Sequence, residues 1–357
     1  MSARVYNLIV LGIVGLFLIP AAYLALTQEP LTGDLTRIGG FAERDYGWQG
    51  TKPRFVTESF RYRAADQPIV SAPVVVIGDS FSHQSDHGFG WQNFFVARTG
   101  LDLLVYHLRG RPAEQVLSSP ELRRRPPRLV IYQIGELNLP DYLPAFAGDC
   151  TLPDERTWAP LPVNPTPYRL EPLARRTSWG WELKPRVEQA MHLIKVRALG
   201  YLRPPKVRRL RLTRTDLFSS REQTLLVYGY DLPTDDWRSV DLAGMACGLR
   251  NLKTKVEREL GAPMVVLYAP GKLSVYAAAV AGARPSWGGF IPDLIERSGV
   301  PAPAVLERLL GAVAAGTRDL YLPNDSHWGD TGHAIAADAL YDFLLARGLI
   351  EVAGSAP

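Results

Sequence analysis

Short runs of consecutive apolar residues, separated by longer mixed segments, recur over most of the chain. Such runs are rich in β-branched residues and predict buried strands. Four of them lie at 73–78, 103–108, 128–134 and 263–268, and a shorter one lies at 320–322. The segment 91–98 between two of the runs has a helical pattern that ends at Gly100. Strands separated by helices indicate an α/β domain with a doubly wound parallel sheet.

The last third of the chain continues this rhythm, with apolar residues at helical spacing. The pattern predicts helices at 240–260, 291–297, 304–315 and 334–346. Before them, residues 146–238 break the pattern and are rich in Pro, Trp, Arg and Tyr, so we interpret them as one large insertion. Residues 195–214 of this insertion hold eight basic residues and no acidic one. They predict a solvated basic face or, alternatively, contact with acidic lipid headgroups or an anionic polysaccharide.

The N-terminal pattern is different, because residues 6–27 are 22 residues without a charge. As a helix they would extend about 33 Å, enough for a bilayer core of about 30 Å. Arg4 precedes the run, and Glu29 and Asp34 follow it, which predicts a cytoplasmic N-terminus and a periplasmic body on the inner membrane. A cleaved signal peptide is the alternative. A buried helix of a soluble domain is less favoured, since Pro20 lies within the run and no periodicity marks a core-facing side.

These patterns divide the 357 residues into an anchor at 1–28, a linker and approach to the domain at 29–72, and one domain at 73–350. A hydrophobic content of 46% is sufficient for a large core. The net charge of +4, without a basic stripe of interleaved aromatic residues, gives no argument for a nucleic acid partner. The two cysteines, Cys150 and Cys247, are too few for a typical zinc site. They predict a disulfide in an oxidising compartment, with a buried free thiol at Cys247 as the alternative.

The candidate chemistry begins where the first buried run ends, in the turn that contains Ser80. A hydroxyl at the carboxyl end of a parallel strand points into the crevice where such sheets bind ligands. Ser80 is the candidate nucleophile, His327 the candidate base, and Asp325 the group that orients the imidazole. The candidate oxyanion donors are the backbone N–H groups of Ser80 and Gly110 and the side-chain amide of Asn138. Together these residues predict acyl-transfer chemistry through a Ser-His-Asp triad.

Each of these residues also has a simpler interpretation. The Ser80 and Gly110 segments can be ordinary turns, Asn138 can cap nearby backbone, and His327 can be a core histidine. A second pair, Asp330 and His333, competes with the first pair, but it lies at a predicted helix start, so we expect His333 to pack behind the site. No histidine pair has helical ligand spacing beside a carboxylate, so the sequence indicates no metal site, and no motif indicates a cofactor.

The motifs resemble those of SGNH-superfamily hydrolases and acyltransferases, and more narrowly the alginate O-acetyltransferase-like branch. The resemblance rests on four stretches: GDSFS, PPRLVIYQIGELNLPDYL, LYAPGKLSVY and NDSHWGDTGH. Ser80, Gly110, Asn138 and the pair Asp325/His327 match the four SGNH blocks. The resemblance implies a three-layer α/β/α, flavodoxin-like SGNH fold. It also marks four candidate substrate-binding residues: Lys272, Tyr276, Trp328 and Arg109.

The same resemblance implies O-acetylation of an exported polysaccharide, with a membrane O-acyltransferase as acetyl donor. Two features depart from the branch. The Asp-x-His segment follows the serine block here, whereas in the alginate enzymes it precedes that block. Leu137 follows Glu136 where the family usually has arginine. We therefore retain two hypotheses: a periplasmic O-acetyltransferase or acetylesterase acting on sugar hydroxyls, and a non-catalytic polysaccharide-binding assembly factor with an SGNH-like shell.

Overall fold

The computed structural model covers most of the chain. It describes residues 2–27, 31–50, 52–55, 60–83, 90–143, 146–173, 184, 186–191, 194, 206–232 and 241–352. Most of the basic run expected at 195–214 lies outside this set, because only residues 206–214 are described.

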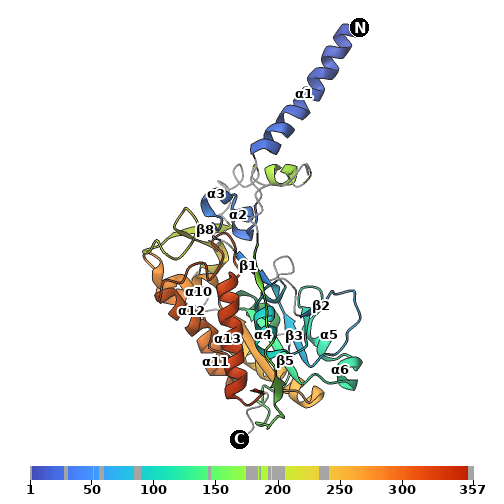
Figure 1. Cartoon of the computed structure of the whole chain (residues 1–357), viewed down its shortest axis with the longest axis vertical. Helices are drawn as coiled ribbons and strands as arrows, with labels where there is room; N and C mark the ends of the chain where they lie inside the picture. The colour runs from blue at the N-terminus through green and yellow to red at the C-terminus, as the bar shows by residue number, and fades with distance from the viewer. Residues whose placement is uncertain are drawn as a thin grey trace.

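The N-terminal apolar run forms helix α1 (Ala3–Thr27), which projects away from the body (Figure 1). None of its most apolar window, Ala3–Pro20, is buried. The helix is therefore not packed into the core of the described domain. By length and composition α1 can cross a membrane, and a signal sequence would have the same properties.

The central sheet has five parallel strands in the order β10-β5-β3-β4-β2. Four of them confirm the strands predicted from the apolar runs. Their bounds are β3 (Val74–Gly78), β4 (Leu103–His107), β5 (Leu129–Gly135) and β10 (Met264–Ala269). The edge strand β2 (Arg61–Arg63) comes from the segment that the sequence had suggested to be a linker.

Helices cover both faces of this sheet, so alternate strand residues enter two separate cores. Val76, Val105 and Ile131 face one core, which α4 (Trp91–Thr99), α12 (Val305–Ala314) and α13 (Asp330–Ala346) complete. The opposite core is completed by α5 (Ala113–Leu117), α6 (Pro120–Arg124), α9 (Leu242–Lys255) and α11 (Ile291–Ser298). Burial on both faces explains why the strands are continuous apolar runs without alternation.

One prediction about the chain between elements is wrong. Residues 320–322 do not form a strand, although they are buried; Tyr321 makes only an isolated bridge with Trp328. The segment 29–72, expected to be a linker and an approach to the domain, contains several regular elements. Besides β2, it forms α2 (Asp34–Gly39), α3 (Glu43–Tyr46) and β1 (Lys52–Phe55).

The strands of residues 146–238 lie outside the central sheet. β6 (Leu161–Val163) pairs with the C-terminal β11 (Ile350–Val352), and β7 (Leu170–Leu173) pairs with β1. β8 (Val207–Arg211) and β9 (Thr224–Tyr228) form an antiparallel pair. Val207 and Leu226 of this pair pack on Leu35 of α2, so the N-terminal segment and the β8–β9 pair share a small core.

The remaining short elements shape the loops at the ends of the central strands. They are η1 (Ser80–Ser82), η2 (Glu136–Asn138), α7 (Leu139–Tyr142), η4 (Gly229–Asp231), η6 (Val256–Leu260), α10 (Lys272–Tyr276), η7 (Ala277–Ala279) and η8 (Pro285–Gly288). Along the long axis of the molecule, α2, α3 and β8 lie at the end from which α1 departs, and the C-terminus lies toward the other end (Figure 1).

Cys150 and Cys247 form a disulfide, as predicted, across 97 residues of sequence. Constraining so long a loop in the unfolded chain is worth about 4 kcal/mol in the chain-entropy model. We therefore expect the double variant Cys150→Ser, Cys247→Ser to lose about that much free energy of unfolding in a urea titration. Two alkylatable thiols in unreduced protein isolated from an oxidising compartment would contradict the bridge.

Candidate active site

The candidate site lies at the carboxyl ends of β3, β5 and β10, where parallel sheets commonly bind ligands. A cavity of about 420 Å³ opens there. Its lining comes from six parts of the chain: Asp34; Ser80 and Phe81; Gly135–Asn138 and Asp141; Tyr228, Tyr230 and Asp231; Ala269–Lys272; and Ser326 and His327.

Ser80, His327 and Asp325 form a continuous hydrogen-bonded chain. His327 Nε2 lies 2.8 Å from Ser80 Oγ, and His327 Nδ1 lies 2.6 Å from Asp325 Oδ1. The same Asp325 oxygen accepts the His327 backbone N–H at 3.0 Å. The imidazole is thereby oriented with Nε2 toward the hydroxyl, which is the arrangement that activates a serine nucleophile.

The charges of the site favour an imidazole of high proton affinity. Burial alone would lower the pKa of His327, but the charge and hydrogen bond of Asp325, with the charges of Asp34 and Asp79, raise the pKa to about 9. Burial would raise the pKa of Asp325, but the bonds and charge of His327 lower it well below its usual range. Asp325 is therefore a carboxylate placed to stabilise a protonated His327 imidazole.

Asp79 fixes the turn that presents Ser80. Its Oδ1 accepts the Phe81 N–H at 3.1 Å, and its Oδ2 accepts the Gly135 N–H at 2.6 Å and the Asn138 amide at 2.7 Å. Asn138 thus lines the cavity with one amide hydrogen bound to Asp79 and a second amide hydrogen available. The Ser80 N–H has no acceptor among the described residues. Ser80 and Asn138 therefore remain suitable oxyanion donors.

Gly110 and Arg109 do not belong to this cavity. Both are exposed in the turn after β4, and a Cβ on Gly110 would meet Ala65. Neither residue lines the cavity, so the structure does not support their predicted roles in oxyanion and substrate binding. The sequence could not show this, because a glycine turn after the second strand satisfies the motif wherever its N–H points.

Tyr276 and Trp328 are core residues, contrary to the prediction that they bind substrate. Both are fully buried. The Tyr276 hydroxyl accepts the Tyr321 N–H at 3.3 Å. The Trp328 ring contacts the edge of Phe81, which in turn packs against His327 with ring centroids 4.9 Å apart. Trp328 therefore supports the imidazole from behind and does not contact the cavity.

Lys272 lines the cavity, but its ammonium group is hydrogen-bonded to the backbone of the loop that carries Asp325. Nζ donates to the carbonyls of Leu322, Pro323 and Asp325 at 2.8, 3.0 and 3.0 Å. An ammonium group has three donors, and all three are used. Burial lowers the pKa of Lys272 to about 7 against the opposing charges of Asp325 and Asp34. We therefore assign Lys272 as a positioning residue rather than a substrate ligand.

Asp34 is a site residue that the sequence did not indicate. Its backbone N–H donates to Asp325 Oδ2 at 3.1 Å. Its carboxylate accepts the Ser326 N–H at 2.9 Å, the Ser326 hydroxyl at 2.5 Å and the Tyr228 hydroxyl at 2.7 Å. Burial and the nearby charge of Asp325 raise the pKa of Asp34. No sequence signal marks Asp34, because it begins a short helix, α2, in a segment without periodic pattern.

The first turn of α2 also binds the neighbouring residue, Asn324. The N–H groups of Leu35 and Thr36 donate to the Asn324 carbonyl at 3.1 and 3.3 Å. A side chain at Gly33 would collide with this carbonyl, so the close approach requires glycine. The Asn324 amide in turn donates to the buried carboxylate of Glu43 in α3. The N-terminal segment therefore packs against the loop 322–327, which carries Asp325 and His327, and helps to hold it in place.

His333 packs behind the site, as expected. Its Nδ1 accepts the Trp91 N–H at 3.1 Å, and its buried ring meets Trp328 edge-on. The pair Asp325/His327, and not Asp330/His333, therefore faces Ser80. Asp34, Asp325 and His327 lie close enough to resemble a cation site, but both nitrogens of His327 are already hydrogen-bonded to Asp325 and Ser80.

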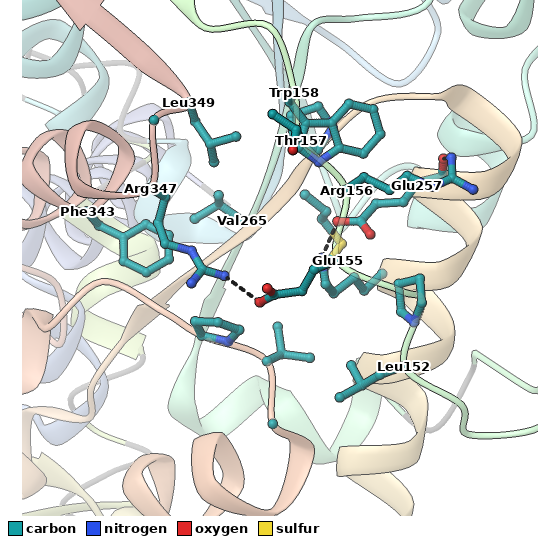
Figure 2. A pocket seen from close by; sticks show the side chains of 18 of the residues that line it. Leu152, Glu155, Arg156, Thr157, Trp158, Glu257, Val265, Phe343, Arg347 and Leu349 are labelled. Atoms are coloured by element: carbon teal, nitrogen blue, oxygen red, sulfur yellow. Dashed lines mark hydrogen bonds and ion pairs between the residues drawn. The ribbon is translucent and has the colours of Figure 1, made fainter.

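A second cavity of about 490 Å³ lies at the amino-terminal end of β10, whereas the first cavity lies at the carboxyl end of the same strand. Figure 2 shows Glu155 and Arg347 pointing toward each other across it, as an ion pair at 3.6 Å. Glu257, which is buried, pairs with Lys253 at the same cavity. The described residues around it include no nucleophile with an adjacent base, unlike those around the first cavity.

Comparison with known proteins gives no relative: no family model, no curated protein and no solved structure matches the chain.

The charges around His327 predict the pH dependence of Ser80 acylation. Below its pKa the imidazole is protonated and cannot accept the Ser80 proton, so the rate should rise with pH toward about 9. Asp34→Asn keeps the volume and an acceptor for Ser326 but removes a charge that raises this pKa. We expect the rising limb to move to lower pH by up to about one unit.

The measurement is the rate of fluorophosphonate labelling between pH 5 and about 10, the span over which a histidine of raised pKa titrates. Asp342→Asn is the matched control, because Asp342 is an exposed carboxylate paired with Arg308 on the surface. A slower Asp34→Asn variant with an unshifted limb would show that Asp34 acts only through packing.

Proposed function

We propose that the protein is a membrane-anchored serine O-acetyltransferase or acetylesterase that acts on hydroxyls of an exported polysaccharide, with an SGNH-type catalytic domain. The observation that carries this proposal is the hydrogen-bonded chain Ser80–His327–Asp325 at the mouth of a cavity. Such a chain is the minimal apparatus for a covalent acyl-enzyme.

The reaction has two halves. His327 Nε2 takes the Ser80 proton while Oγ attacks the acetyl carbonyl of the donor ester. The Ser80 N–H and the Asn138 amide stabilise the resulting oxyanion. The carbon–oxygen bond to the leaving alkoxide breaks, His327 returns the proton to that alkoxide, and Ser80 is left acetylated. A sugar hydroxyl then attacks the acetyl carbonyl of this ester while His327 Nε2 takes the hydroxyl proton. The bond between the acetyl carbon and Ser80 Oγ breaks, His327 returns the proton to Oγ, and the acetylated sugar leaves; water in place of the sugar gives acetate.

The position of the site relative to α1 supports a reaction close to the membrane surface. Asp34 is seven residues beyond Thr27, the last residue of α1. Seven extended residues span at most about 25 Å, so the cavity lies close to the end of the apolar helix. A membrane O-acyltransferase could therefore present an acetyl donor within reach. The Cys150–Cys247 bridge is also consistent with an oxidising, exported location.

The alternative, a non-catalytic assembly factor, draws on Leu137, which lines the cavity where the family usually has arginine. The preceding Glu136 does not depend on an arginine. Its carboxylate accepts the N–H groups of Gly271 and Phe290 at 2.8 Å each and the Ser274 hydroxyl at 2.7 Å. A buried carboxylate with these donors is satisfied without a cation, so the missing arginine leaves the local structure intact.

Fluorophosphonate labelling separates the two hypotheses. We expect the full-length protein in detergent to be labelled at Ser80, and Ser80→Ala and His327→Ala to lower the labelling rate by at least about a thousandfold. Ser118→Ala, at the end of α5, is the matched serine control. An unlabelled Ser80 in folded protein would favour the assembly factor.

The topology is tested with reporter fusions. A positively charged start followed by an apolar span predicts that the body lies in the periplasm. Alkaline phosphatase fused after residue 357 should be active, and the fusion should stay with membranes through a carbonate wash. An inactive phosphatase with a fluorescent cytoplasmic reporter at the same position would place the body inside the cell. Release of an active phosphatase by the wash would instead indicate a cleaved signal sequence.

A further inference from the structure

The described part of the cavity includes one wall that the triad chemistry does not use. This wall is the end of β9 and the following short helix η4, which bring Tyr228, Tyr230 and Asp231 to the cavity. The rings of Tyr228 and Tyr230 are stacked, with centroids 4.8 Å apart and planes within 10°. Tyr228 is held by its bond to Asp34, so Tyr230 rests on a fixed support. Tyr230 is nevertheless 66% exposed, which leaves a flat aromatic face open to solvent.

Asp231 supplies a polar group whose hydrogen bonding is incomplete. Its side chain is only 7% exposed. Oδ2 accepts the Tyr228 N–H at 3.0 Å, whereas Oδ1 is buried without a hydrogen-bond partner. An unpaired buried acceptor is unfavourable, and such groups in native proteins commonly have a functional reason. Burial raises the pKa of Asp231 to about 7, although the Tyr228 hydrogen bond opposes the shift.

The charged side chains that line the cavity are mostly acidic. Asp34, Glu136, Asp141 and Asp231 contribute carboxyl groups, and Asp141 is exposed. The cationic side chain among the lining residues, apart from a protonated His327, is Lys272, and its three donors bind backbone carbonyls. Among the described lining residues, none therefore offers a free cation to a bound carboxylate. Like charges in a confined cavity repel an anionic ligand.

We propose that Tyr230 and Asp231 form an acceptor subsite for a sugar unit without a carboxylate. The apolar face of the sugar ring stacks on Tyr230, and a ring hydroxyl donates to Asp231 Oδ1. The surrounding carboxylates exclude uronic acids. This inference rests on the proposed function and gives its acceptor class: a neutral polysaccharide rather than the acidic glycan that the basic run 195–214 suggested.

Binding to a catalytically silent protein tests the subsite without relying on turnover. The protein is the full-length Ser80→Ala variant in detergent, and the probes are neutral hexasaccharides of glucose (α- and β-linked), mannose and galactose, with a hexagalacturonate as the anionic probe. We expect at least one neutral probe to bind at least about tenfold more tightly than the uronate at low salt, because screening is weakest there.

Two further substitutions locate the binding. Tyr230→Ala removes the stacking face. In Asp231→Asn, the amide oxygen can still accept the Tyr228 N–H. The amide NH2 group, a donor, then takes the place of the unpaired acceptor Oδ1. Each should weaken binding of the neutral probe at least about tenfold. Tyr168→Ala is the matched control, because Tyr168 is also exposed but does not line the cavity.

The proposal is overturned if no neutral probe binds, if the uronate binds as tightly as the neutral probes, or if both variants retain full affinity. These results are independent of Ser80 labelling. If Ser80 is labelled but neutral sugars do not bind, the subsite proposal is wrong and the acyl-chemistry proposal stands. If Ser80 is not labelled but sugar binding depends on Tyr230, the acyl-chemistry proposal is wrong and the subsite proposal stands.

Discussion

The site depends on how an irregular loop, residues 322–327, is held without regular backbone pairing. Within the loop, the Asp325 N–H donates to the Leu322 carbonyl at 3.2 Å and the Leu322 N–H donates to the His327 carbonyl at 3.1 Å, and the other buried carbonyls need donors from outside. Lys272 supplies donors to Leu322, Pro323 and Asp325, and the first turn of α2 supplies donors to Asn324. Each carbonyl from 322 to 325 therefore has a partner from outside the loop. This arrangement places Asp325 and His327 opposite Ser80, although the chain separates them from it by more than two hundred residues.

The same contacts balance the charges of the loop. Lys272 brings a buried cation beside the carboxylates of Asp325 and Asp34, and the imidazolium of His327 forms in their field. A buried ammonium group with three carbonyl acceptors is satisfied, and removing it would take away the Nζ donors to those carbonyls and a positive charge near Asp325 and Asp34. The backbone conformation of the loop and the charge balance around Asp325 both depend on Lys272. Because its three donors are used in this way, Lys272 lines the cavity but is not free to bind a ligand.

The sequence predicted the parts of the fold whose pattern is set by burial on two faces. β3, β4, β5 and β10 are continuous apolar runs, and Ser80, Asp325 and His327 follow such runs in recognisable motifs. Residues 320–322 were misassigned because an apolar run shows that a segment is buried but not that it pairs in a sheet. Tyr276 and Trp328 were misassigned for a related reason: proximity in sequence to site residues does not show which way a ring points.

The N-terminal segment could not be predicted because its role is created by tertiary contacts. α2 and α3 are one or two turns long, and Asp34 and Glu43 are ordinary surface residues by composition. Their importance comes from the surfaces they meet, namely Asn324, Asp325 and Tyr228. A domain that began at residue 73 would lack β2, the first turn of α2 and the Glu43 contact. The smallest unit with an intact site therefore begins before Gly33. Because α2 carries Asp34 and lies at the end of the body from which α1 departs (Figure 1), the segment that completes the site also lies near the apolar helix.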